Sequence, residues 1–255
     1  MEKFKGVYPV IITPMKENFE INYEGLKENV NYFIKQKVSG LVINGSTGEF
    51  VSLTEKEKEE IIKTVISTVN GAFPIIVGTA SEYTNDAIRL TQSAENLGAD
   101  GVLVINSYYA HPTDEEVYHQ FKDIAESTSL PVMIYNNPFT TGIDIGQNTL
   151  IDLGNNIKNI THLKESSGSI QKLRDIHYAT GNNLTLFCGS DDLAFESFVM
   201  GAQGWVSVAG NLAPNLTKEL YKKIESKDFN SAHETYKKLL PLLQFIEDSG
   251  KYVQI

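Results

Sequence analysis

Lys164 is the residue whose position in this sequence most directly indicates chemistry. It closes the apolar run Ile157–Lys164, which has the character of a buried strand, and Glu165 follows at once. A lysine at the end of a buried strand is either paired with an acid, for which Glu165 is the neighbouring candidate, or kept as an unpaired amine. An amine held away from water and from a counter-ion is a nucleophile.

Hydroxyl groups stand at the ends of two other apolar runs. Tyr135 closes the run Pro131–Tyr135, and Ser46 and Thr47 directly follow the run Gly40–Asn44. A neutral amine can attack a ketone and, after water leaves, form an iminium that draws electrons from the neighbouring bonds. A phenol can carry the protons that this reaction moves, and aliphatic hydroxyls can relay them. The three strand ends therefore predict carbonyl chemistry through a Schiff base, with Tyr135 as the proton carrier.

Backbone N–H groups near these residues provide candidate sites for an anion. The turn Gly45–Gly48, and the helix start that follows Glu165–Gly168, could each present N–H groups to a carboxylate without any arginine. A ketone next to a carboxylate is a 2-keto acid. We therefore expect a 2-keto acid as the substrate.

Each of these signals also has a plain structural explanation. Lys164 could be a salt-bridged lysine, and Tyr135 could be a packing tyrosine with a satisfied hydroxyl. The Gly45–Gly48 segment could be a simple turn, since it lacks the lysine of a phosphate-binding loop. The placement of all three at strand ends is what favours the catalytic interpretation.

Other polar residues carry weaker signals. The one cysteine, Cys188, lies in an apolar run, so we expect it to be packed in the core and unreactive. Asp191 and Asp192 could bind a metal ion, but the sequence favours helix capping. His162 is expected to be a packed core histidine. Tyr109, on a predicted loop, indicates a pocket wall or a subunit contact.

Short apolar runs alternate with amphipathic segments along the whole chain. The apolar runs predict strands at Gly6–Thr13, Gly40–Asn44, Pro74–Thr79, Gly101–Ile105, Pro131–Tyr135, Ile157–Lys164, Leu184–Gly189 and Gly204–Val208. The amphipathic segments predict helices at Tyr23–Gln36, Thr54–Val69, Thr84–Leu97, Thr113–Ser127, Ile170–Thr180, Pro214–Ser226 and Phe229–Glu247. Nearly continuous apolar strands are typical of a parallel sheet covered by helices on both faces. Eight strand–helix units predict an α/β fold, a (β/α)8 TIM barrel, whose reacting groups gather at the C-terminal ends of the strands.

The overall charge narrows the range of partners. The chain has 255 residues and a formal net charge of −10, which argues against nucleic acid or an anionic membrane surface as the partner. The start of the chain has no signal-peptide pattern, and no apolar run reaches the length of a membrane span. We therefore expect a soluble, cytoplasmic protein.

Three motifs, in this order, resemble those of the dihydrodipicolinate synthase / N-acetylneuraminate lyase family. They are Gly45-Ser-Thr-Gly-Glu49, Tyr135-Asn-Asn-Pro138 with Thr141-Gly142, and Lys164-Glu-Ser-Ser-Gly168. The resemblance runs from Gly6 to the end of the chain. Members are (β/α)8 class I lyases and aldolases that act on pyruvate or related 2-keto acids.

The resemblance implies a role for each matching residue. Lys164 would form the Schiff base, Tyr135 would shuttle protons, and Thr47 would be the hydroxyl relay. The main chain of Ser46 and Thr47 would bind the keto-acid carboxylate. Gly189 and Val206 would line the pocket floor.

The resemblance also implies an assembly and the absence of a cofactor. Tyr109 would reach across a tight dimer into the neighbouring active site, so a homo-oligomer, either a dimer or a tetramer, is expected. The lysine–substrate imine would take the place of a cofactor, and no metal is expected.

Two departures from the family pattern are visible. Dihydrodipicolinate synthases carry an arginine that grips the second substrate's carboxylate at the position of Thr140, and Phe139 precedes it here. Thr140 is therefore expected to contact a different second substrate. The barrel is expected to span residues 1–212, and residues 213–255 a helical region shorter than in the family.

The sequence as a whole predicts a Schiff-base lyase or aldolase that cleaves, condenses or dehydrates pyruvate or a related 2-keto acid. One alternative is a dihydrodipicolinate synthase (4-hydroxy-tetrahydrodipicolinate synthase), which joins pyruvate to aspartate semialdehyde in lysine biosynthesis. An alternative of another class is a non-catalytic barrel that acts as a binding or scaffold protein.

Overall fold

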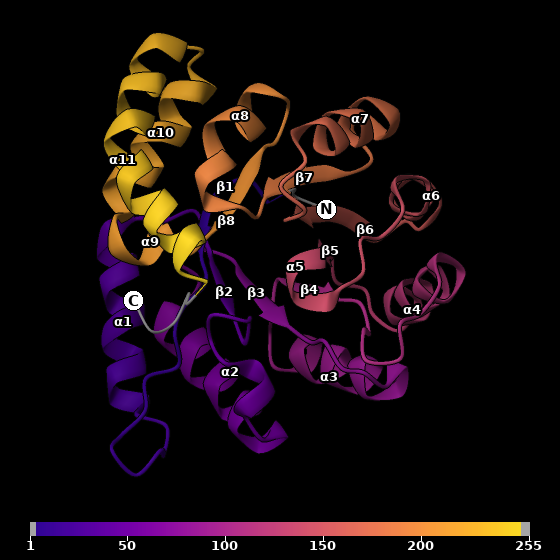
Figure 1. The fold of residues 1–255 in the computed structure, drawn as a ribbon. Coiled ribbons are helices and arrows are strands. Elements are labelled where there is room, and N and C mark those ends of the chain that lie inside the picture. The colour runs from indigo at the N-terminus through magenta and orange to yellow at the C-terminus, as the bar shows by residue number, and fades with distance from the viewer. Residues whose placement is uncertain (1–3, 251–255) are drawn as a thin grey trace.

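Eight parallel strands form the centre of the protein in a computed structural model, which describes residues 4–250 (Figure 1). The strands are β1 (Gly6–Pro9), β2 (Leu41–Ile43), β3 (Ile75–Gly78), β4 (Gly101–Ile105), β5 (Val132–Asn136), β6 (Ile160–Glu165), β7 (Thr185–Cys188) and β8 (Gly204–Ser207). From β2 to β8 each strand pairs with the next one in sequence, and β8 pairs with β1. A bridge between Val10 and Val42 joins β1 to β2, so the sheet closes into the predicted (β/α)8 barrel.

Helices follow the strands around the outside of the barrel. The predicted helices are found as α1 (Tyr23–Gln36), α2 (Glu55–Val69), α3 (Thr84–Asn96), α4 (Asp114–Glu126), α7 (Ile170–Thr180), α10 (Pro214–Glu225) and α11 (Phe229–Ser249). The helices α5 (Pro138–Thr141), α6 (Gln147–Asn156), α8 (Ala194–Val199) and α9 (Ala209–Leu212) were not predicted. Three of these four are too short to show a helical period, and α6 ends in Gly154-Asn-Asn156, residues that disfavour a helix.

The start of β6 corrects one predicted boundary. The sequence predicts a strand from Ile157, but Ile157 is the C-cap of α6, and β6 begins at Ile160. The N–H of Ile160 donates to the carbonyl of Ile157 at 3.1 Å, so a turn occupies residues 157–159. The Asn159 amide holds this turn by donating to three carbonyls near the end of α4 and in the connection to β5, those of Ala125, Thr128 and Leu130. An apolar run alone does not reveal where such a turn gives way to a strand.

Side chains from the strands fill the barrel interior. Tyr8, Met133 and Phe187 are almost fully buried there, and the rings of Tyr8 and Phe187 meet edge to face. His162 lies among them, stacked on Phe4, and its Nε2 accepts the Phe4 N–H at 3.1 Å. The expected role of His162 as a packed core residue is confirmed.

Two helix starts carry the capping boxes that their sequences indicate. The Thr54 hydroxyl accepts the N–H of Glu57, whose carboxylate accepts the N–H of Thr54 in return. Thr113 and Glu116 make the same pair of bonds at the start of α4. Each box satisfies N–H groups that would otherwise have no partner, and so fixes where α2 and α4 begin relative to the strands before them.

The last two helices pack side by side against one flank of the barrel (Figure 1). The C-terminal end of α11 reaches the rim at the ends of the strands, where the Glu247 carboxylate accepts the N–H of Asp191 at 2.7 Å. Side chains near the C-terminus of α11 therefore lie beside the strand ends.

Neither a helix that could cross a membrane nor a metal cluster is present in the described range. No helix within residues 4–250 combines the length and the apolar character needed to cross a bilayer. Across the same residues, no group of three or more His, Cys, Asp or Glu side chains is arranged to hold a metal ion.

Phe187→Ala tests the packing of the barrel interior. Phe187 is fully buried, so its removal leaves a cavity, and we expect the free energy of unfolding to fall by about 3–5 kcal/mol in a urea titration. The matched variant Phe19→Ala removes a ring that is 82% exposed, and its effect should stay within about 0.5 kcal/mol. Equal effects of the two variants would contradict this packing.

Cys188 should be unreactive in the folded protein. Burial raises the pKa of its thiol to about 12, and Sγ lies 3.0 Å from the carbonyl oxygen of Ser190. Because pH 8 is far below this raised pKa, the thiol stays protonated there and is a poor nucleophile. A disulfide reagent should modify it only after unfolding in guanidinium. Reaction at the same rate before and after unfolding would show that the thiol is accessible in the native fold.

Candidate active site

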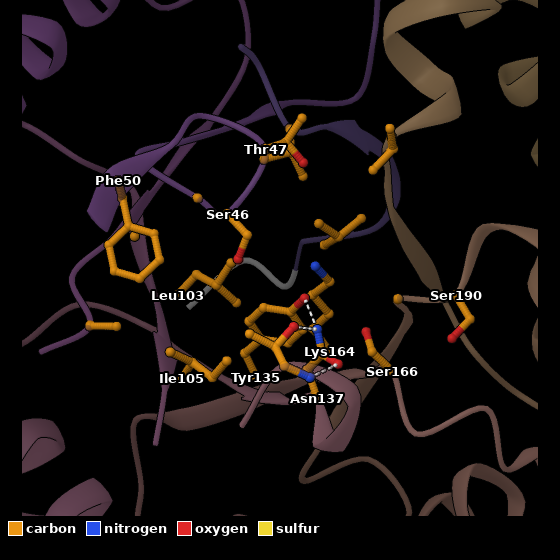
Figure 2. Close-up of a pocket in the computed structure, with 18 of the residues that line it drawn as sticks. Ser46, Thr47, Phe50, Leu103, Ile105, Tyr135, Asn137, Lys164, Ser166 and Ser190 are labelled. Atoms are coloured by element: carbon orange, nitrogen blue, oxygen red, sulfur yellow. Dashed lines mark hydrogen bonds between the residues drawn. The ribbon is translucent and has the colours of Figure 1, made fainter. Parts of the chain in front are cut away.

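A pocket opens at the C-terminal ends of the strands (Figure 2). The residues predicted from the sequence that line it are Ser46, Thr47, Tyr135, Thr140, Lys164, Gly189 and Val206. They come from five strand ends and from the loops that follow, yet they surround one space. Tyr109 is the predicted site residue that does not line this pocket.

The Lys164 amine is buried in the pocket and faces the ring of Tyr135. The side chain is 7% exposed, and Nζ lies 3.7 Å from the centre of the Tyr135 ring. No ion pair involving Lys164 is found within residues 4–250. The ring face attracts the amine when it is protonated, but it does not bind the proton as a carboxylate would. Asp191 and Glu247 line the same pocket, but neither forms an ion pair with the amine.

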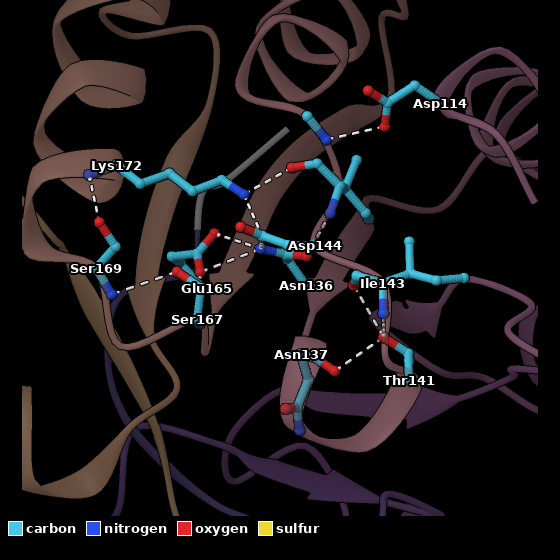
Figure 3. A network of polar contacts seen from close by, with 12 residues as sticks. Asp114, Asn136, Asn137, Thr141, Ile143, Asp144, Glu165, Ser167, Ser169 and Lys172 are labelled. Atoms are coloured by element: carbon cyan, nitrogen blue, oxygen red, sulfur yellow. Dashed lines mark hydrogen bonds and ion pairs between the residues drawn. The ribbon is translucent and has the colours of Figure 1, made fainter. Parts of the chain in front are cut away.

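Glu165 is not the partner of Lys164, which excludes the salt-bridge alternative for this pair. Successive side chains of a strand point to opposite faces, so Lys164 points into the barrel and Glu165 points out of it. The Glu165 carboxylate accepts from the Asn136 amide at 3.0 Å and from the Ser167 N–H at 2.6 Å (Figure 3). Burial raises the pKa of Glu165, and these hydrogen bonds oppose that rise.

A partly buried polar network ties the ends of β5 and β6 together behind the pocket (Figure 3). Asn136, at the end of β5, donates to both Glu165 and Asp144, and its carbonyl oxygen Oδ1 accepts the Ile145 N–H at 3.1 Å. Lys172 forms an ion pair with Asp144. The network fixes the two strand ends that carry Tyr135 and Lys164, although it touches neither side chain.

Gly189 leaves the space that the Lys164 side chain occupies. A Cβ added at Gly189 would lie 3.0 Å from Cε of Lys164 and 1.9 Å from Oγ of Ser166. Any larger residue would push the amine or the Ser166 hydroxyl out of place. Because the Lys164 and Ser166 side chains lie so close to the backbone of residue 189, only glycine fits at this point of the pocket floor.

Asn137 is a site residue that the sequence reasoning did not single out. Its Nδ2 donates to the Tyr135 hydroxyl oxygen at 2.7 Å and to the Thr140 hydroxyl at 3.0 Å. Because the Tyr135 oxygen accepts this bond, the proton of the Tyr135 hydroxyl remains available to donate to another group. Asn137 stands inside the Tyr135-Asn-Asn-Pro motif, so the motif contained the signal, but its spacing did not show the contact.

The hydroxyl relay from Thr47 to Tyr135 stays a prediction. Thr47 is buried and lines the same pocket, but no hydrogen bond joins it to Tyr135 in the described part of the chain. Figure 2 shows Ser46 and Thr47 on one side of the space, and Tyr135 and Lys164 on the other. A substrate or a water molecule between the two sides would complete such a relay.

The turn at Gly45–Gly48 presents two free N–H groups. The N–H groups of Gly48 and Glu49 are used within the turn, whereas those of Ser46 and Thr47 have no acceptor among the described residues. The other predicted anion site is the start of α7, whose first residues do not line this pocket, and the N–H of Lys172 there donates to the Ser169 hydroxyl at 3.1 Å. The geometry thus favours the Ser46–Thr47 backbone as the carboxylate site.

Asp191 forms part of the pocket wall and caps a helix. Its carboxylate accepts from the Ser207 hydroxyl at 2.7 Å and from the N–H groups of Val208 and Ala209 at 2.9 and 3.1 Å. Burial raises the pKa of Asp191, and these bonds oppose that rise. Capping was expected of Asp191 and Asp192 where they stand, but no side chain caps the turn that Asp191 begins or the helix α8 after it. Asp191 instead accepts the first N–H groups of α9 on the next strand–helix unit.

Tyr109 lies outside this pocket and is 85% exposed. The Glu82 carboxylate accepts the backbone N–H groups of Tyr108 and Tyr109 at 3.0 and 3.1 Å. The loop is therefore held in place while the ring of Tyr109 projects from the surface. This placement fits a subunit contact better than a wall of the protein's own pocket.

Fold and pocket together define a class of enzyme. A (β/α)8 barrel with a buried amine, an adjacent phenol and free N–H groups at the strand ends is a lyase of the kind that forms a Schiff base.

Comparison with known proteins assigns the chain to a family within this class. The dihydrodipicolinate synthetase family profile matches residues 3–255. A 4-hydroxy-tetrahydrodipicolinate synthase from Methanocaldococcus jannaschii is 38% identical over 247 residues, which are 96% of this chain and 84% of the relative. One from Oceanobacillus iheyensis is 36% identical over 241 residues, which are 94% of this chain and 81% of the relative.

A solved structure agrees with these relatives. The chloride-inhibited dihydrodipicolinate synthase from Acinetobacter baumannii, complexed with pyruvate, has a TM-score of 0.93 at 33% identity and covers 96% of this chain and 84% of its own. The chain belongs to the dihydrodipicolinate synthetase family, and it is a Schiff-base-forming lyase. Family membership and the lysine–tyrosine pair together set aside the non-catalytic scaffold alternative.

Asn137→Asp tests whether Asn137 positions the Tyr135 hydroxyl. The variant keeps an acceptor for the Thr140 N–H that caps α5, but it removes the donor to Tyr135. Imine formation with a 2-keto acid should slow about tenfold, the effect of one hydrogen bond. Thr140→Val removes the other partner of the Asn137 amide and should slow the reaction less. Unchanged rates in Asn137→Asp would show that Tyr135 needs no such support.

Proposed function

We propose that Lys164 forms a Schiff base with pyruvate or a related 2-keto acid and catalyses aldol cleavage or condensation, or a related dehydration. The observation that carries the proposal is the Lys164 amine, buried in the pocket beside the Tyr135 ring with no acid partner. The N–H groups of Ser46 and Thr47 hold the substrate carboxylate, and Gly189 and Val206 form the floor beneath the keto group.

The proposed steps need only groups that line the pocket. The amine nitrogen attacks C2 of the keto acid, and Tyr135 gives a proton to the oxygen that was the carbonyl. A proton from the nitrogen, carried by Tyr135, then reaches the same oxygen, which leaves as water. The iminium that remains accepts the electron pair of a bond at C3, and the Tyr135 oxygen takes up the proton released from C3 or from the C4 hydroxyl. If that bond is C3–H, the resulting enamine attacks an aldehyde; if it is C3–C4, an aldehyde leaves. The imine is the electron sink, so the proposal requires no cofactor.

A second candidate is the reaction of 4-hydroxy-tetrahydrodipicolinate synthases, which condense pyruvate with aspartate semialdehyde. The names of the relatives favour it. The presence of Thr140 in place of the family's arginine argues against it, because no guanidinium would bind the second substrate's carboxylate. An assay of this condensation with the purified chain separates the two, since efficient turnover would favour the synthase.

We also propose that the protein forms a homo-oligomer. The exposed Tyr109 ring, on a loop that Glu82 holds in place, supports this proposal. A tyrosine projecting from a fixed loop presents a large apolar face with a hydroxyl at its tip, which suits a protein–protein contact.

Reductive trapping tests the Schiff base directly. Pyruvate and borohydride should leave a stable adduct on Lys164, located by mass spectrometry of the digested protein. Lys164→Arg keeps the positive charge but cannot form an imine, and it should yield no adduct. Lys58→Ala removes another partly buried lysine, which lies near Phe50 at the pocket edge and has a pKa lowered by burial, and it should keep the adduct. A folded protein that gives no adduct, or one located on Lys58, would overturn the proposal.

A further inference from the structure

The turn that carries Ser46 and Thr47 begins and ends in an unusual backbone conformation. Asn44, directly after β2, has a φ of 51°, and Glu49, at the far end of the turn, has a φ of 57°. Both angles lie in the left-handed region, which side chains other than glycine rarely adopt. Because glycine would adopt this conformation without strain, a larger residue here costs free energy that other interactions must offset.

Asn44 is buried and connects the start of this turn to α2. The residue is 2% exposed and lines the pocket, and its Nδ2 donates to the backbone carbonyl of Lys58 at 3.3 Å. Its Oδ1 is buried and has no hydrogen-bond partner among the described residues. Asparagine tolerates the left-handed region better than an apolar residue does, but a buried acceptor without a partner is unfavourable for stability. Stability of the fold alone therefore does not account for Asn44.

The segments around the turn hold it in one position. A Cβ at Gly78 of β3 would lie only 2.1 Å from the backbone oxygen of Asn44 and 3.4 Å from the nitrogen of Gly45. The start of the turn thus lies directly against β3 and cannot shift toward it. At the other end, the Thr13 hydroxyl donates to the carbonyl of Gly48 at 2.7 Å.

These restraints determine the direction of two N–H groups. Two N–H groups of the turn bond back within it, and those of Ser46 and Thr47 remain free. They lie across the pocket from Lys164 (Figure 2). A change in φ at Asn44 would rotate the segment that carries both groups. Donors that are already oriented bind an anion more favourably than donors that must first be ordered.

We propose that Asn44 is a positioning residue, whose left-handed backbone and amide bond to α2 direct the Ser46 and Thr47 N–H groups at the substrate carboxylate. Asn44 acts through the turn and needs no contact with the reacting atoms. The inference rests on the proposed Schiff base at Lys164 and on the proposed carboxylate site. It adds the residue that sets the geometry of that site.

Competitive trapping measures recognition of the carboxylate separately from the chemistry at Lys164. The purified full chain is incubated with equimolar isotopically labelled pyruvate and pyruvamide, which differ in having a carboxylate or a neutral amide next to the ketone. Cyanoborohydride reduces the imines, and mass spectrometry of the digested protein gives the ratio of the two adducts on Lys164. The intrinsic reactivities of the two ketones are the same for every variant, so they cancel when ratios are compared.

The wild type should favour pyruvate over pyruvamide more strongly than N-acetyl-lysine does in solution. Asn44→Ala should lower the ratio of pyruvate to pyruvamide adducts about tenfold, the effect of one hydrogen bond to a charged group. Alanine disfavours the left-handed backbone and also lacks the amide. Asn44→Gly should lower the ratio about threefold, because glycine keeps the conformation but loses the bond to α2.

Asn70→Ala is the matched control. Asn70 has a φ of 46°, stands at the C-terminal end of α2 and is exposed. Its substitution by alanine introduces the same kind of backbone strain away from the pocket. The adduct ratio of this variant should equal that of the wild type, and an equal fall in Asn70→Ala and Asn44→Ala would contradict a specific role for Asn44.

The pyruvamide adduct shows whether a variant has damaged the site in another way. In Asn44→Ala it should form at close to the wild-type rate, because Lys164 and Tyr135 are unchanged. A purely structural role for Asn44 would lower both adducts together and leave their ratio unchanged, which would overturn this inference but not the Schiff base. An unchanged ratio in Asn44→Gly would overturn the role of the amide, and this variant decides the question if Asn44→Ala does not fold.

Two further outcomes would overturn the proposed function as well. A wild type with no more preference for pyruvate than N-acetyl-lysine would overturn the carboxylate site at Ser46 and Thr47, and this inference with it, but not the Schiff base. The absence of both adducts on Lys164 in folded protein would overturn the Schiff base itself.

Discussion

The separation of one amine from one carboxylate at the end of β6 is the constraint on which the site depends. Lys164 and Glu165 are adjacent in sequence. In the unfolded chain water would surround both side chains, so the amine would be neither buried nor separated from the acid. Within a strand, their side chains must point to opposite faces, and the closed barrel turns these faces into a pocket and a helix-covered exterior. The amine is thereby buried without its nearest counter-ion. A shift of β6 by one residue would exchange the two side chains and place the acid in the pocket.

The polar network around Asn136 and Glu165, on the outside of the barrel, stabilises this separation. A buried carboxylate without partners is costly, but Glu165 receives bonds from Asn136 and from the Ser167 N–H. The same Asn136 amide reaches Asp144, which Lys172 neutralises. The chain thus satisfies the acid on the outside of the barrel while the amine on the inside stays unpaired. The network also joins β5 to β6, and so holds the Tyr135 ring against the Lys164 amine.

Much of the fold could be predicted because its signals are local. The apolar strands, the amphipathic helices and the capping boxes at Thr54 and Thr113 each depend on residues close in sequence. The exclusion of Glu165 as the partner of Lys164 follows from strand alternation, but only once the position of β6 is known. The start of β6 itself was misplaced, because the turn at Asn159 is held by carbonyls about 30 residues earlier, at the end of α4 and in the connection to β5.

The parts of the site that were not predicted depend on contacts between distant segments. Nothing near Glu247 in sequence indicates that the end of α11 meets the loop after β7. Asp191 was recognised as a cap, but the helix it caps begins 18 residues later. The hydrogen bond from Asn137 to Tyr135 depends on how the chain bends after β5. The motif that contains both residues indicates such a bend but not its geometry. Such contacts bring acidic and hydroxyl side chains to the same pocket as Lys164 and Tyr135.

A crystal structure of the protein grown with pyruvate tests the central claim most directly. We expect continuous electron density from Nζ of Lys164 to C2 of the keto acid, its carboxylate on the N–H groups of Ser46 and Thr47, and Glu165 on the outside against Asn136. An intact ammonium of Lys164 paired with a carboxylate, with pyruvate bound elsewhere or not at all, would contradict it.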